Sequence, residues 1–139
     1  MKLFLSFNSK DTRVASALRD ALVRLDPGLE IFFSPVSLGQ GFWLPKLAEG
    51  IRAADAFLLL MAQGGPGPWQ EMEYFEALDR RVKDAGFALV PVIVGSGNAP
   101  GLPFLRQLNW VEIAAAFEDD AIRKVLAALR GEEVVPSWH

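Results

Sequence analysis

The segment AFLLLMA, residues 56–62, is the longest unbroken apolar run in the sequence. It is too short to span a lipid bilayer, which takes about 20 residues in a helix, and its length suits a buried strand. Similar runs occur at residues 2–7, 30–33, 88–94 and 110–113. Runs that are apolar at nearly every position, instead of alternating, are typical of a parallel sheet with helices on both faces. The sequence therefore predicts a sheet of five buried parallel strands.

Helical patterns separate these runs. Residues 12–25 place Val14, Leu18 and Leu22 on one face, which is the spacing of an amphipathic helix. Further helices are predicted at residues 43–54, 68–85 and 119–130, with one short turn at 103–107. Gly86 is expected to end the helix before it in the left-handed conformation. The alternation of strands and helices predicts a flavodoxin-like, doubly wound α/β fold with strand order 2-1-3-4-5 and right-handed crossovers.

The composition indicates one soluble globular domain. The chain has 139 residues, of which 51% are hydrophobic and 22% are charged, so it has enough apolar material for a sizeable core. Its net charge of -3 gives no excess of positive charge for direct binding of nucleic acid or of an anionic membrane. The amino terminus lacks the features of a secretory signal, so a cytoplasmic location is expected. We assign residues 1–131 to the domain and 132–139 to a carboxyl-terminal tail or linker.

Missing residue types exclude several kinds of active site. There is no cysteine, and the single histidine is His139, which excludes a Ser-His-Asp triad, a cysteine nucleophile and an ordinary zinc site. A phosphate-accepting receiver domain needs an aspartate at the end of the third strand, where this chain has Met61 and Ala62. No GK[ST] sequence is present, and the glycine-rich GSGNAPG (95–101) contains Pro100 and precedes Pro103, where a nucleotide-binding helix should begin. Chemistry must therefore depend on carboxylates, hydroxyls, lysine or arginine, and no metal or cofactor is expected.

The strand order predicts where a ligand would bind. In open sheets of this order, ligands bind beyond the carboxyl ends of strands one and three, where the strand order reverses. The loops there are residues 8–11 and 63–68, and the second leads directly into Trp69 and Glu73. These two residues are four apart and share one helix face. Acidic residues also suit the first turn of a helix, and tryptophan is often a core residue, so this pattern alone leaves a structural role open.

A single carboxylate at this position suits one kind of glycosidic bond. Glycoside cleavage normally needs two acids, one of which protonates the leaving group. The nicotinamide of NAD already has a positive charge on its ring nitrogen, so it departs as a neutral molecule without protonation. One glutamate that stabilises the oxocarbenium-like ribose could then suffice, with aromatic side chains to hold the flat rings.

Several separated motifs resemble the TIR (Toll/interleukin-1 receptor) domain family, from about Leu3 to Leu129. FLSFNSKD (4–11) is similar to the first strand and its loop, and IFFSPVSLGQGFW (31–43) is similar to the second strand with the long BB loop. AADAFLLLMA (53–62) is similar to the third strand, and WQEME (69–73) fits the W-x-x-x-E pattern of catalytic members. The order and spacing of these motifs are more specific than any one of them.

The resemblance implies an enzyme, an NAD glycohydrolase that produces ADP-ribose or a cyclic or variant form of it. Such members serve immune signalling, in antiphage defence or cell death, after self-association. In this chain Glu73 would be the catalytic carboxylate, and Trp69 would shape the nicotinamide side of the pocket. The other implied substrate-binding residues are Phe7, Asn8 and Ser9 from the first loop, and Ser34 and Trp43 from the BB loop. NAD would be the substrate, and other copies of the domain would bind through the BB loop, Ser34 to Trp43.

Three positions depart from the family pattern. Ser34 replaces an acid that is common after the second strand, Gln70 stands where a cysteine is frequent, and the first loop has Lys10 without an arginine. These departures bear on the product and the rate more than on the fold.

Two other functions remain open at the level of sequence. One is a non-catalytic module that pairs with other TIR domains, and the other is an enzyme like the nucleoside deoxyribosyltransferases, which the long loop 34–43 disfavours. The basic cluster Arg80, Arg81 and Lys83 is interpreted as a solvated helix face.

Overall fold

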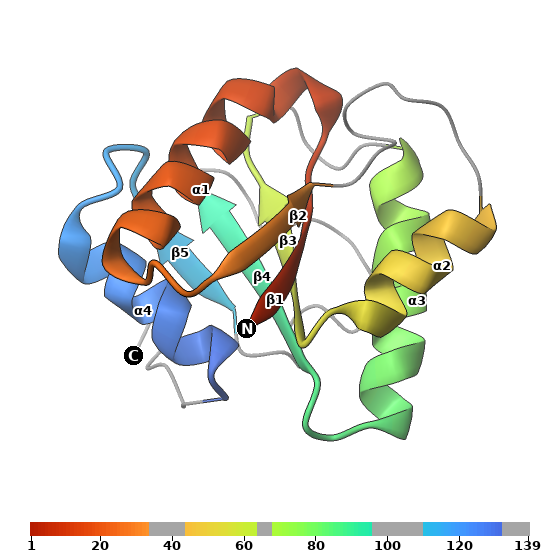
Figure 1. The fold of residues 1–139 in the computed structure, drawn as a ribbon. Coiled ribbons are helices and arrows are strands. Elements are labelled where there is room, and N and C mark those ends of the chain that lie inside the picture. The colour runs from red at the N-terminus through yellow and green to blue at the C-terminus, as the bar shows by residue number, and fades with distance from the viewer. Residues whose placement is uncertain (34–43, 64–67, 96–109, 132–139) are drawn as a thin grey trace.

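The computed structural model describes residues 1–33, 44–63, 68–95 and 110–131. Within these ranges, parallel strands form a 5-stranded sheet of order β2-β1-β3-β4-β5 (Figure 1). The strands are β1 (Lys2–Ser6), β2 (Glu30–Phe33), β3 (Ala56–Met61), β4 (Ala88–Val94) and β5 (Val111–Ile113). Every neighbouring pair is parallel. The predicted flavodoxin-like sheet and its strand order are confirmed.

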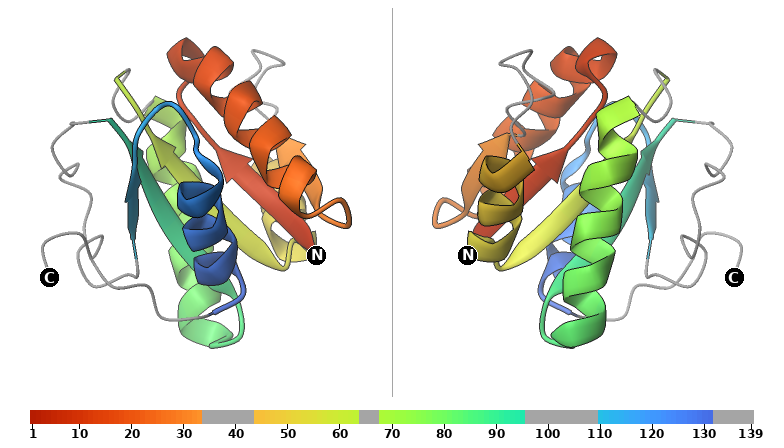
Figure 2. Two further views of the ribbon diagram at one scale, coloured as in Figure 1. Left: turned by 90° about the vertical axis from the view of Figure 1, so that its left-hand side faces the viewer. Right: turned by 90° about the vertical axis from the view of Figure 1, so that its right-hand side faces the viewer.

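Helices cover both faces of this sheet. α1 (Thr12–Leu25) and α4 (Asp119–Leu129) lie on one face, and α2 (Leu44–Ala53) and α3 (Pro68–Lys83) lie on the other (Figure 2). A short 3-10 helix, η1 (Ser9–Asp11), joins β1 to α1. None of the helices in the described ranges is long and apolar enough to cross a membrane. The short turn predicted at residues 103–107 and the tail at 132–139 lie outside the described residues.

The central strand β3 explains why its sequence is apolar at every position. All six of its residues are buried, and successive side chains of a strand point to opposite faces. Leu58 and Leu60 belong to the core shared with α1 and α4, whereas Phe57 and Leu59 belong to the core shared with α2 and α3. A strand with an apolar layer on each side has no solvated face and therefore no polar alternation.

Gly86 does not have the left-handed conformation predicted for it. Among the described residues, the glycines with positive φ are Gly95 and Gly131. α3 ends at Lys83, and the carboxylate of Asp84 accepts a hydrogen bond from the backbone N–H of Gly86 at 3.0 Å. An aspartate side chain thus closes this turn by hydrogen bonding to the backbone two residues on, which removes the need for a left-handed glycine.

Arg80 contradicts the prediction of a solvated basic face. Its Nη1 group donates to three carbonyl oxygens around the carboxyl end of α2, those of Ile51, Arg52 and Ala54, at 2.5, 2.9 and 2.5 Å. Its guanidinium carbon also lies 4.1 Å from the centroid of the Phe87 ring. Lys83 does behave as predicted, because it is exposed and pairs with Asp79 at 2.9 Å on the same helix. Arg80 therefore joins α3 to the end of α2.

Candidate functional site

Glu73 lies where the strand order reverses, between the carboxyl ends of β1 and β3. β1 ends at Ser6, and the Oγ of Ser6 donates a hydrogen bond to Oε1 of Glu73 at 3.2 Å. Both side chains are fully buried, with 0% of each residue exposed. The carboxylate therefore points inward, toward the carboxyl end of β1.

Gln70 holds the first turn of α3 against the same two strands. Its Nε2 group donates to the backbone oxygen of Ser6 at 3.2 Å and to that of Leu60 at 2.6 Å. Only 2% of Gln70 is exposed. Gln70 thus fixes the helix that presents Glu73.

The first loop places its predicted site residues in three different environments. Phe7 is buried, and its ring meets that of Phe33 edge-on with 4.9 Å between centroids. Asn8 is also buried, and its Oδ1 accepts from the backbone N–H of Lys10 at 3.1 Å, which caps η1. Ser9 is exposed. In this conformation Phe7 packs in the core and Asn8 shapes the loop, so of the three only Ser9 offers an open surface.

The remaining predicted residues are described in part or not at all. Ser34 and Trp43, with the whole predicted BB loop, lie outside the described residues. Trp69 belongs to the first turn of α3, and only its backbone is described. The structure therefore brings Glu73 together with the end of β1, while the aromatic side of the predicted pocket stays a prediction.

The family of the chain follows from comparison with known proteins. The TIR domain family profile matches residues 3–126. This chain is a TIR domain. The match includes β1, β2, β3 and α3, and therefore every residue that the sequence motifs assigned to the site.

Solved structures with the same fold belong to proteins of different kinds. The CMP N-glycosidase of Clostridium botulinum is 17% identical to this TIR domain, with a TM-score of 0.56 over 93% of this chain and 100% of that chain. A structure from Klebsiella pneumoniae assigned as a quinone reductase is 12% identical, with a TM-score of 0.52 over 97% of this chain and 86% of that chain. No curated protein matched the sequence. At these identities the likeness shows the fold alone.

Ser6 and Gln70 are the site residues that sequence reasoning missed. Ser6 directly precedes the first loop, and Gln70 is three residues before Glu73, so the two helical residues share one face. The helical spacing from Glu73 was a signal for Gln70. The role of Ser6 depends on a contact between residues 67 positions apart, which no local pattern reveals.

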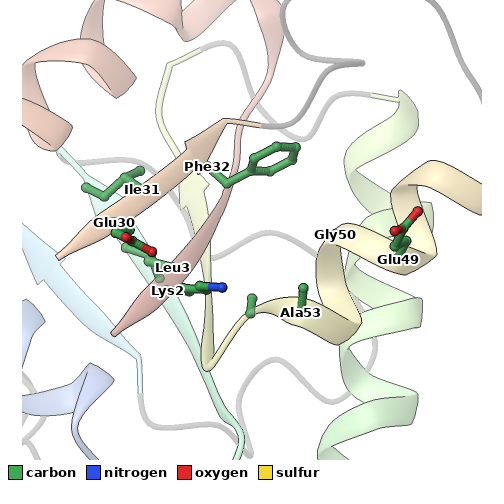
Figure 3. Close-up of a pocket in the computed structure, with 9 residues that line it drawn as sticks. Lys2, Leu3, Glu30, Ile31, Phe32, Glu49, Gly50 and Ala53 are labelled. Carbon is green, nitrogen blue, oxygen red and sulfur yellow. The ribbon is translucent and has the colours of Figure 1, made fainter.

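A hollow lies at the opposite, amino-terminal end of the strands. Its volume is about 450 Å³, and it lies between the start of β1, the strand β2 and the second half of α2 (Figure 3). Phe32 and Lys2 project toward α2 from neighbouring strands in this view. Glu30 and Glu49 also line it. Because it opens at the other end of β1 from Ser6, this hollow is separate from the site around Glu73.

The described residues show no metal site. Among them there is no group of three or more His, Cys, Asp or Glu residues that could hold a metal ion. Glu73 is itself covered, so a ligand reaches its carboxylate only when neighbouring groups move aside.

Proposed function

We propose that this TIR domain is an NAD glycohydrolase that breaks the bond between nicotinamide and ribose, with Glu73 as the catalytic carboxylate. The observation that carries the proposal is the buried carboxylate of Glu73, held by the hydroxyl of Ser6 at the switch point of the sheet. Ligands of this fold bind at that edge. The substrate would be NAD, and no cofactor would be needed.

The chemistry needs one carboxylate because the leaving group is already activated. The bond between C1′ and the pyridinium nitrogen breaks with its electron pair going to nitrogen, which leaves nicotinamide neutral. The ribose carbon gains positive charge, and a fixed carboxylate in a water-poor site stabilises that charge strongly. Water then adds to C1′ and releases a proton, which gives ADP-ribose. Attack by a ring nitrogen of the adenine would give a cyclic form instead.

The CMP N-glycosidase shares the fold of this domain, but its name gives a substrate with a different base. The pyrimidine of CMP has no positive charge, so its departure normally needs a proton from a second acid. With Glu73 as the only carboxylate assigned to the site, a nicotinamide leaving group fits better.

Self-association is part of the proposal, because Glu73 is covered in the single chain. The exposed side of α3 presents Met72, Phe75 and Val82, with 39%, 43% and 80% of each exposed. Their spacing places them along one side of the helix. Exposed apolar strips of this kind are typical of surfaces that bind another protein. The same strip favours the second candidate function, a non-catalytic module that binds other TIR domains through the BB loop and its helices.

The test is mass spectrometry of NAD after incubation with the domain, both dilute and fused to a scaffold that forces oligomers. We expect nicotinamide with ADP-ribose or its cyclic form, and a higher rate per molecule in the oligomers. A parallel incubation with CMP tests the other base. No nicotinamide from either sample would leave the binding module as the function, and release of cytosine alone would replace NAD by a pyrimidine nucleotide.

A further inference from the structure

Ser6 is bound twice by α3, once through its side chain and once through its backbone. Its hydroxyl donates to Glu73, and its carbonyl oxygen accepts from Gln70, both at 3.2 Å. Gln70 and Glu73 are three apart and lie on the same face of α3. The three residues therefore form a hydrogen-bond network that joins the last residue of β1 to the first two turns of the helix.

Gln70 also extends this hydrogen-bond network to β3. The same Nε2 group donates to the oxygen of Leu60 at 2.6 Å, and Ser6 pairs in register with the neighbouring Leu59. A carboxamide nitrogen has two hydrogens, so one group serves two strand carbonyls at the point where the chain leaves the sheet. This pair of acceptors also fixes which way the amide faces, because its oxygen would be repelled there.

We infer that Gln70 and Ser6 are positioning residues for the carboxylate of Glu73. Gln70 sets the height and rotation of the first turn of α3 against β1 and β3, and Ser6 then holds the carboxylate itself. The kinetic part of this inference rests on the proposed function. A displacement of about 1 Å in a reacting group can cost about a hundredfold in rate, so a side chain that fixes the helix controls turnover without contacting substrate.

A purely structural role for Gln70 is the competing explanation. Strand carbonyls that lose a buried donor destabilise any protein, and loss of stability alone can reduce apparent activity. The two explanations differ in kcat measured on folded protein, because only a positioning role lowers it.

The first test replaces Gln70 by methionine, which is of similar length and apolar but cannot donate to the two carbonyls. We expect kcat for nicotinamide release to fall by about tenfold to a hundredfold, with KM within about twofold because the substrate contacts are retained. The matched control is Leu22→Ala in α1, which is fully buried on the other face of the sheet. It should lower the melting temperature and leave kcat of the folded protein unchanged.

Ser6→Ala is the second variant, and it keeps the backbone contact of Gln70 while removing the hydroxyl. We expect the same pattern: kcat falls by about tenfold, and KM is nearly unchanged. This variant keeps the inference testable if Gln70→Met does not fold. An active wild type with kcat unchanged in Ser6→Ala and in folded Gln70→Met would overturn the inference and leave the proposed function intact.

Hydrogen exchange of the backbone amides provides a readout that does not depend on activity. In Gln70→Met, the amides of residues 70–76 should exchange faster, while those of the buried strand β4 keep the wild-type rate. If the wild type releases no nicotinamide, the proposed function fails, and faster exchange at 70–76 would still support Gln70 as the anchor of this turn. Unchanged exchange there would overturn the anchor itself.

Discussion

Tyr74 shows that the interior beside the site disfavours charge. It follows Glu73 directly, is fully buried and belongs to the core shared with α2 and α3. Burial raises the pKa of the Tyr74 hydroxyl above its ordinary value of 10.0, because the phenolate loses its hydration. The same lack of water would strengthen the attraction between a carboxylate and a developing positive charge.

The raised pKa of Tyr74 predicts a loss of stability in alkali. Above about pH 10 the tyrosine of the unfolded chain loses its proton while the folded protein keeps it, so the free energy of unfolding falls as pH rises. This contribution is fully present below the unfolded value and disappears as pH rises through the folded one. Urea unfolding between about pH 8 and 11 measures it, and Tyr74→Phe should show a shallower decline.

The absorbance of tyrosinate gives an independent check, because Tyr74 is the single tyrosine of the chain. We expect it to appear in the native protein only at a pH above that for the urea-unfolded chain. Coincident titration of native and unfolded protein, or the same pH dependence in Tyr74→Phe, would contradict the burial effect.

At the scale of secondary structure, the α2–α3 layer depends on Arg80. The last carbonyls of a helix have no partner within it, and Arg80 reaches across from α3 to three carbonyls near the end of α2. One side chain therefore provides the carboxyl-terminal cap of α2 and a link between two helices.

Arg80→Met should lower the free energy of unfolding by about 1 to 3 kcal/mol, because hydrogen bonds from a charged donor are lost while the side-chain length is kept. Chemical denaturation measures the change. The control is Arg123→Met in α4, whose pair with Asp120 is exposed and should contribute about 0 to 1 kcal/mol. Equal effects of the two substitutions would show that Arg80 is not a cap.

At the scale of the whole molecule, the fold was predictable and the site only in part. Strands covered on both faces are apolar at nearly every position, so β3 and β4 were visible as continuous runs. The place of Glu73 followed from strand order and from its spacing to Trp69. Gln70 and Ser6 were not predicted, because their contacts join residues 64 and 67 positions apart. The left-handed conformation predicted for Gly86 was wrong, because the side chain of Asp84 closes this turn.

Two candidate places for a small ligand, both among the described residues, lie at opposite ends of the strands. One is the edge around Glu73, which is covered, and the other is the hollow of about 450 Å³ lined by Phe32 and Glu49. The hollow is the more open of the two. Its charged groups, Lys2, Glu30 and Glu49, lie away from the strand-order reversal at which this fold binds ligands. The proposed catalysis is therefore placed at the covered edge.

The rate of nicotinamide release by three single-substitution variants, each measured in the forced oligomers, tests this assignment most directly. Glu73→Gln keeps the shape of the side chain and should lower turnover by about a hundredfold or more, as for loss of a charge that stabilises the transition state. Glu76→Gln on the exposed side of α3 and Glu49→Gln at the hollow should stay within about twofold of the wild type. Wild-type turnover in Glu73→Gln, or a loss confined to Glu49→Gln, would contradict the account.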